Sequence, residues 1–135
     1  MRVVLDTNVL ISALFWGGAP RRVVDLAAAG HFQAVTSPEL LAELEAVLAG
    51  DFGVPQDKLE LVLRDILSYA EVVTAVEEPE LPVRDLADVK AIACAIAGRA
   101  HYIVTGDQDL LSLPPVGPIR ILTVRDFLDL RHWPG

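Results

Sequence analysis

The sequence predicts an α/β fold in which a central parallel sheet of about four to five strands lies between two layers of helices. Short β-branched runs alternate with helical segments along the chain, which is typical of parallel sheets with helices on both faces. Hydrophobic residues make up 53% of the 135 residues, a share that favours strands buried on both faces. The length suits one domain, which we expect to span residues 1–135.

Two β-branched runs bracket two helical segments in the first third of the chain. The first run, RVVL, stops at Asp6, which places an acid at the carboxyl end of a buried strand. Gly17, Gly18 and Pro20 separate the helical segments, and Gly30 ends the second one. The expected elements are a strand at 2–5, helices at 8–14 and 21–29, and a strand at 32–35.

The middle of the chain is predicted to be mostly helical. Ser37 followed by Pro38 is a strong helix start, because serine caps free backbone amides and proline fits the first helical position. Asp85 is a plausible cap for a later helix, which Gly98 should close. The expected elements are helices at 38–49 and 57–70, a short strand around 71–74, a loop at 77–82 and a helix at 86–97.

The last third of the chain repeats the strand and helix alternation. A strand is expected at 102–105, and the turn-forming prolines and glycine of 114–118 separate it from another strand at 119–122. A closing helix is expected at 124–130.

Three aspartates fall at the expected carboxyl ends of strands. Asp6 follows the first strand, and Asp107 and Asp109 follow the strand that ends at residue 105. In an open α/β sheet the ligand site lies beyond these ends, so two strands would deliver acids to one edge. The alternative is that aspartates favour turns and caps for local hydrogen-bonding reasons.

Two helices carry further acids that can face this edge. Asp88 shares the apolar stripe that should face the sheet, where a carboxylate needs a metal or hydrogen bonds. Glu43 borders the apolar stripe of its helix, whereas Glu39 and Glu45 fit a solvated face. A helix-dipole interaction stays open for Asp88, and a solvated position for Glu43.

Carboxylate clusters suit hard cations such as Mg²⁺ or Mn²⁺. Such an ion activates bound water and neutralises the charge that develops during phosphodiester hydrolysis. Cys94 is the only cysteine, which excludes a zinc cluster built on thiolates and indicates a reducing, cytoplasmic location. We expect neither a signal peptide nor a membrane span.

The chain contains four segments in a fixed order: VVLDTNVLISAL, SPELLAELEAVL, RDLADVKAIACAIAGRAHYIVTGDQDLLSL and ILTVRDFL. Together they resemble a PIN domain, in particular the prokaryotic PIN-family toxins of toxin–antitoxin systems (VapC-like). The resemblance implies a Mg²⁺- or Mn²⁺-dependent endoribonuclease with a three-layer α/β/α fold. It also implies an RNA substrate, a cognate antitoxin and a homodimer.

The resemblance also assigns roles to residues. Asn8 and Thr105 resemble the polar residues that orient the site by hydrogen bonding. Relatives often carry asparagine where this chain has Val89, which puts a local hydrogen bond in question rather than a metal ligand. The implied metal-binding and catalytic acids are Asp6, Glu43, Asp88 and Asp107, with Asp109 as a further candidate ligand.

Two other functions compete with a nuclease. A PIN-like domain that has lost cleavage could serve as a binding module or scaffold, although all four acids are present. A HAD-type phosphatase also starts with a strand that ends in aspartate, but it needs a second aspartate two residues later, where this chain has Asn8. Metal-dependent cleavage of RNA would separate these alternatives.

The formal net charge of −8 counts against a broad basic surface for nucleic acid, so RNA should be held by a few local cations. Arg21, Arg22 and Arg84 are the best candidates, and we expect them near the acidic edge. Trp16 is expected in a loop, as a core or dimer contact rather than a platform for base stacking.

Overall fold

The computed structural model describes residues 1–74 and 86–135, with side chains in the second range from residue 88 onward. The loop expected at 77–82, the Asp85 cap and Arg84 lie outside the described residues. Five parallel strands form one sheet in the order β3-β2-β1-β4-β5. The strands are β1 Arg2–Leu5, β2 Gln33–Thr36, β3 Ala70–Val72, β4 Tyr102–Val104 and β5 Arg120–Leu122.

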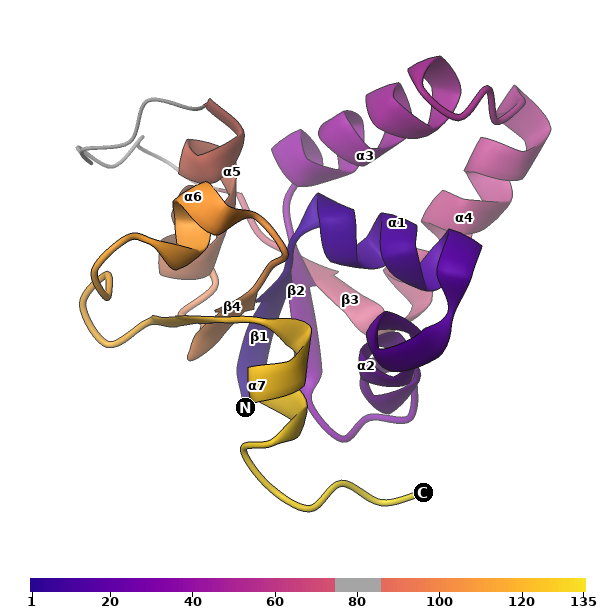
Figure 1. The fold of residues 1–135 in the computed structure, drawn as a ribbon. Coiled ribbons are helices and arrows are strands. Elements are labelled where there is room, and N and C mark those ends of the chain that lie inside the picture. The colour runs from indigo at the N-terminus through magenta and orange to yellow at the C-terminus, as the bar shows by residue number, and fades with distance from the viewer. Residues whose placement is uncertain (75–85) are drawn as a thin grey trace.

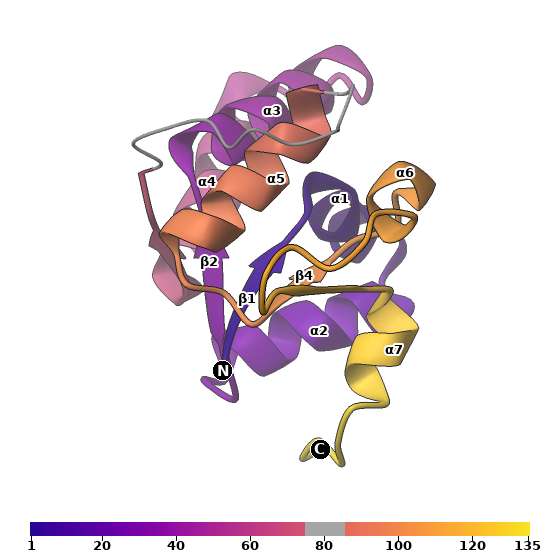
Figure 2. The same ribbon diagram turned by 90° about the vertical axis from the view of Figure 1, so that its left-hand side faces the viewer.

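Helices cover both faces of the sheet, as the sequence predicts (Figure 1). Figure 2 shows the strands between α5 on one side and α2 and α7 on the other. The helices are α1 Thr7–Trp16, α2 Gly18–Ala28, α3 Pro38–Gly50, α4 Gln56–Tyr69, α5 Leu86–Ala97, α6 Gln108–Leu111 and α7 Val124–Leu128.

Alternation along the strands divides the core into two layers, because successive strand residues point to opposite faces. Val3 and Leu5 of β1 pack in one cluster with residues of α2 and with Phe127 of α7. Val4, between them in sequence, packs in the other cluster with Ile92 of α5. A third cluster joins α1 to α3 and α4. The described helices are thus fixed on the sheet by apolar contacts on both faces.

The break between the first two helices is narrower than the sequence predicts. Only Gly17, with φ of +67°, separates α1 from α2, and Pro20 lies inside the first turn of α2. A proline there costs little, since the first amides of a helix have no intrahelical partner. Trp16 belongs to α1 and is 68% exposed, so the expectation of a loop or core position was wrong.

The end of α5 also differs from the expected glycine cap. Arg99, with φ of +52°, adopts the left-handed conformation, not Gly98. A Cβ atom at residue 98 would lie 2.6 Å from Cγ1 of Val35, so glycine is needed here for close helix–sheet packing. By contrast, Ser37 caps α3 as predicted, with its side chain accepting a hydrogen bond from the amide of Leu40.

The short helix α6 was missed by the sequence analysis. It follows Asp107 directly and consists of four residues, too few for a periodic pattern. No helix among the described residues has the length and apolar character needed to cross a membrane.

Candidate active site

The register of the two central strands brings two candidate residues together. Leu5 of β1 pairs with Val104 of β4, so the next residues, Asp6 and Thr105, lie side by side at the carboxyl edge. Both are buried, with 6% of Asp6 and 0% of Thr105 exposed. Asp6 also caps α1, because its Oδ1 accepts a 2.9 Å hydrogen bond from the amide of Thr7.

The Thr105 hydroxyl connects three neighbours at this edge. It donates a 2.7 Å hydrogen bond to Oδ2 of Asp6. It accepts hydrogen bonds from the amide of Asp107 at 3.0 Å and from Nδ2 of Asn8 at 3.3 Å. Thr105 therefore fixes the orientation of Asp6 and the path of the chain after β4, as expected of a residue that positions others.

Asn8, in the first turn of α1, forms hydrogen bonds both to Asp6 and to the chain that follows β4. Its Nδ2 donates a 3.0 Å hydrogen bond to Oδ2 of Asp6. Its Oδ1 accepts a 2.8 Å hydrogen bond from the amide of Gly106. A Cβ atom at residue 106 would lie 3.3 Å from Oδ1 of Asn8, so glycine permits this close approach. Sequence analysis missed Gly106, although a glycine directly after a strand that ends in threonine is a usable signal.

Asp107 and Asp109 follow at the same edge but differ in position. Asp107 caps α6, with its Oδ1 accepting a 2.9 Å hydrogen bond from the amide of Asp109. Asp107 is half-buried, whereas Asp109 is exposed. Asp107 therefore does cap a helix, which is the alternative considered for aspartates at strand ends. The Oδ2 atom of Asp107 has no hydrogen bond to a described residue.

Burial dominates the electrostatics of Asp6. Loss of solvent raises the pKa of this carboxyl group above its usual 3.8, and the nearby charge of Asp107 raises it further. Hydrogen bonds from Thr105, Thr7 and Asn8 oppose the shift by stabilising the carboxylate. The net upward direction means that the ionised form of Asp6 is incompletely compensated by its neighbours.

The helical acids lie on α3 and α5, two helices that pack against each other. Asp88 is 3% exposed in the first turn of α5, which itself packs against β1 and β4. Glu43 of α3 lies 3.8 Å from Nζ of Lys90, and its Oε2 is buried without a hydrogen bond to a described residue. Lys90, the one basic residue of α5, was not predicted from the sequence as part of the site.

These acids share the donor chemistry that hard divalent cations prefer, since every candidate is a carboxylate. The burial of Asp6, Asp88 and Glu43 Oε2 also suits a cation, because buried carboxylates need compensating charge. Within residues 1–74 and 86–135, no three acids, histidines or cysteines lie close enough together to hold a metal ion. The four-carboxylate metal site therefore stays a prediction.

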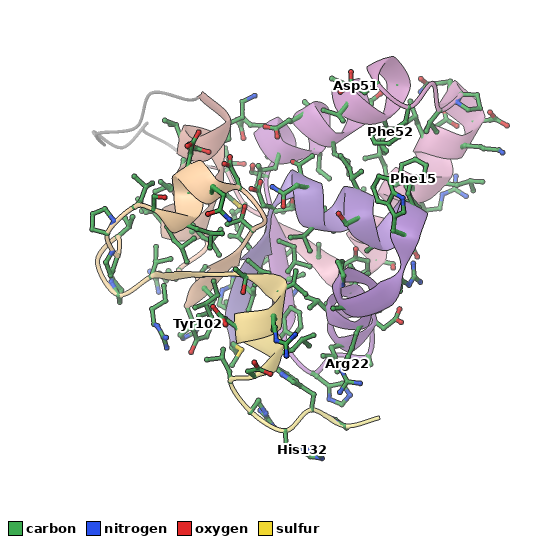
Figure 3. All side chains as sticks on the ribbon, in the orientation of Figure 1. Phe15, Arg22, Asp51, Phe52, Tyr102 and His132 are labelled. Carbon is green, nitrogen blue, oxygen red and sulfur yellow. The ribbon has the colours of Figure 1, made fainter. Side chains whose placement is uncertain are left out.

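The two described arginine candidates for RNA binding, Arg21 and Arg22, both lie on α2. Arg21 pairs with Asp25 on α2, with Nε 3.0 Å from Oδ1. Arg22 donates to the backbone carbonyl of Trp133, and Figure 3 shows it well below α6, toward the C-terminal segment that carries His132. The expectation that Arg22 lies near the acidic edge was wrong, because α2 is turned so that this arginine contacts the C-terminal segment.

Comparison with known proteins identifies the fold family. A family described as the PIN domain matches residues 2–109, which include all the candidate acids. The chain belongs to the PIN domain family. PIN domains are generally nucleases, and the match leaves the phosphatase alternative without support.

Two further comparisons place this PIN domain among its relatives. It is 32% identical over 123 residues to the uncharacterized protein MJ1680 of Methanocaldococcus jannaschii, covering 84% of this chain and 75% of that protein. A chain in the crystal structure of VapBC2 from Rickettsia felis bound to a promoter DNA fragment has the same fold. Its TM-score is 0.63 at 20% identity, over 91% of this chain and 98% of that chain.

The PIN domain of T. brucei RRP44 is also similar in fold. Its TM-score is 0.50 at 15% identity, over 94% of this chain and 76% of that chain. The VapC-like fold expected from the sequence is thus confirmed, and the predicted parallel sheet between helices is the PIN architecture.

Proposed function

We propose that this PIN domain is a Mg²⁺- or Mn²⁺-dependent endoribonuclease. The observation that carries the proposal is the buried Asp6 carboxylate at the junction of β1 and α1, held by Thr105 and Asn8. A carboxylate that is fixed by three side-chain and backbone donors yet keeps a raised pKa is suited to receive a cation. Family membership supports nuclease chemistry.

Asp6, Glu43, Asp88 and Asp107 are the proposed metal ligands, with the exposed Asp109 as a further candidate. Because no three of the described acids are grouped closely enough to hold an ion, metal binding would have to draw these carboxylates together. A bound divalent ion would supply Lewis-acid stabilisation of the phosphodiester and an activated water. Asn8 and Thr105 orient Asp6 through the hydrogen bonds described above. Lys90, 3.8 Å from Glu43, provides a fixed positive charge beside this set and can help to attract the phosphate.

The test is cleavage of single-stranded RNA by the purified chain with Mg²⁺, with Mn²⁺ and with EDTA. Asp6→Asn should abolish cleavage, because it removes a carboxylate from the proposed ligand set. Glu60→Gln is the matched control, since Glu60 is an exposed acid on α4. Cleavage by Asp6→Asn at the wild-type rate would contradict the assignment. RNA binding with no cleavage under any metal would support the binding-module alternative.

A toxin role with protein partners is the second part of the proposal. The VapBC2 relative is a complex by its description, and this supports a cognate antitoxin here. Exposed aromatic rings support a protein interface as well: Phe15 of α1 stacks on Phe52 at 4.5 Å between ring centroids (Figure 3). Both rings are about 40% exposed, at 42% and 39%.

The partner proposal is tested by expressing the chain with and without the product of the neighbouring gene. Toxicity that the neighbouring gene relieves is the expected result, and harmless expression of the chain alone would contradict the toxin role. Light scattering on the purified chain tests the homodimer, which would bury about 1,200 Å² or more in total. A monomer at micromolar concentration would contradict it.

A further inference from the structure

A groove of about 560 Å³ runs along one exposed face of α2. The helix residues that line it recur at three- and four-residue intervals, which places them on one side of the helix. The opposite wall is formed by the C-terminal segment. The lining residues of the groove are Gly18, Arg21, Arg22, Asp25, Leu26, Ala29, His31, Pro134 and Gly135.

The side chains that line this groove carry a small excess of positive charge although the protein is acidic. Two guanidinium groups, from Arg21 and Arg22, face one side-chain carboxylate, from Asp25, among the described residues that line the groove. The net charge of the whole chain is −8, so the side chains of the groove run against the overall charge of the protein. Two arginine side chains in a groove can attract one or a few anionic groups, even though the protein as a whole repels polyanions.

Arg22 has hydrogen-bonding capacity that the protein leaves unused. Its only hydrogen bond to a described residue runs from Nη2 to the Trp133 carbonyl, at a long 3.4 Å. A guanidinium group carries five N–H donors in a fork that matches phosphate oxygens. The remaining donors of Arg22 are therefore available to an anion in the groove.

Arg21 can also turn toward an anion at little cost. Its ion pair with Asp25 is a surface i,i+4 pair whose two side chains are 50% and 60% exposed. Such exposed pairs contribute little to stability, because water and salt screen them. His31 lies at the far end of the groove and adds a ring N–H as a further donor.

The groove and the acidic edge lie at different ends of the sheet. His31 lies two residues before β2, at the amino ends of the parallel strands, whereas Asp6 and Thr105 lie at the carboxyl ends. None of the candidate acids lines the groove, so the groove and the acidic site are separate. A ligand that reaches both places must be extended.

We propose that this groove binds backbone phosphates of single-stranded RNA, as a second contact remote from the acidic edge. The proposal rests on the proposed function for the identity of the ligand, since RNA is the extended polyanion that the acidic edge would cleave. Arg22 and Arg21 each contact a phosphate, and His31 donates to the same strand. This surface lets an acidic protein retain RNA without a broad basic face.

The experiment measures binding of a fluorescein-labelled single-stranded oligouridylate by anisotropy, in EDTA and over a salt series. Arg22→Gln and Arg21→Gln should each raise the Kd several-fold. Each should also lower the slope of log Kd against log salt by about 0.7, the value for one phosphate contact with a single strand. Arg22→Lys should restore most of the slope. Arg64→Gln, which removes an exposed arginine from α4, is the matched control.

The outcomes separate this inference from the proposed function. Unchanged Kd and slope in both groove variants, with RNA bound by the wild type, would overturn the groove alone. If the wild type binds RNA through the groove but does not cleave it with any metal, only the proposed nuclease function would be contradicted. Equal competition by poly-glutamate would identify a site for acidic peptides and overturn the RNA assignment. No binding of RNA by the wild type at low salt would overturn both proposals.

Discussion

The hydroxyl group of Thr105 donates a 2.7 Å hydrogen bond to Oδ2 of Asp6, and this bond joins the end of β4 to the start of α1. The Thr105 hydroxyl oxygen also accepts a hydrogen bond from the amide of Asp107, so one buried hydroxyl contacts both acids that follow the central strands. The position of Asp107 relative to Asp6 therefore depends on the Thr105 side chain, together with Asn8, which hydrogen-bonds to Asp6 and to the amide of Gly106.

Thr105→Val should destabilise the protein by about 1–3 kcal/mol, because a methyl group of the same shape leaves buried polar partners unsatisfied. Asp6 would lose one donor and the amide of Asp107 its acceptor. Urea denaturation of the two proteins measures the change in the free energy of unfolding. RNA cleavage by Thr105→Val should fall as well, since the orientation of Asp6 is no longer fixed.

Thr7→Val is the matched control for that substitution. The Thr7 hydroxyl is buried at the same edge but has no hydrogen bond to a described residue. Its removal should leave the free energy of unfolding unchanged or raise it, because an unsatisfied polar group is lost. A similar loss of stability in both variants would mean that valine is poorly accommodated at this edge, and would contradict the role assigned to the Thr105 hydroxyl.

The titration of Asp6 should contribute to the pH dependence of the free energy of unfolding. Because its folded pKa is raised, the folded state binds more protons than the unfolded state between the two pKa values, so Asp6 destabilises the protein as pH rises. Asp6→Asn removes this titration. The free energy of unfolding of Asp6→Asn minus that of the wild type should therefore increase as pH rises from about 4 toward 7.

The absolute stability of Asp6→Asn follows a different argument. Its Nδ2 would occupy the place of an oxygen that accepts from Thr105 and Asn8, and this donor conflict lowers stability at every pH. The pH slope of the difference is thus the diagnostic quantity, measured by urea denaturation in EDTA. A difference that decreases with rising pH would contradict a raised pKa for Asp6.

Divalent metal should stabilise the folded chain. An ion that binds only the folded state adds about 2.7 kcal/mol when its concentration is 100 times the Kd. Mn²⁺ should therefore raise the melting temperature of the wild type. Asp88→Asn and Glu43→Gln should reduce that rise, whereas Glu60→Gln should leave it intact. An equal rise in all four proteins would contradict the proposed ligands.

Gly98→Ala should destabilise the protein by about 1–3 kcal/mol through overpacking. The new Cβ would lie 2.6 Å from Cγ1 of Val35, a fully buried core residue, and 3.1 Å from the carbonyl oxygen of Cys94. Gly50→Ala, at the end of α3, meets nothing within 4 Å and should stabilise the helix by up to about 1 kcal/mol. Thermal melting of the two variants measures both effects, and opposite signs are the expected result.

Much of the fold could be predicted from local sequence patterns. The β-branched run at Arg2–Leu5, the Ser37 cap and the apolar stripe of α5 each reflect short-range physics that operates before the chain is folded. Asp6, Asp107 and Asp109 could likewise be assigned to one edge, because parallel strands end together. These features need only the identity of neighbouring residues.

The sequence could not supply the features that depend on contacts between distant segments. The sequence predicted that Gly98 closes α5 in a left-handed conformation. In the structure, glycine is needed at residue 98 because a Cβ atom there would collide with the side chain of Val35 on β2. Arg22 was expected near the acids, but the orientation of α2 brings it to Trp133, 111 residues away. The sequence by itself determined the order of elements and the edge that carries the acids, since propensity and periodicity are local. Only the tertiary structure decided which side chains touch, because packing is set by residues far apart in the chain.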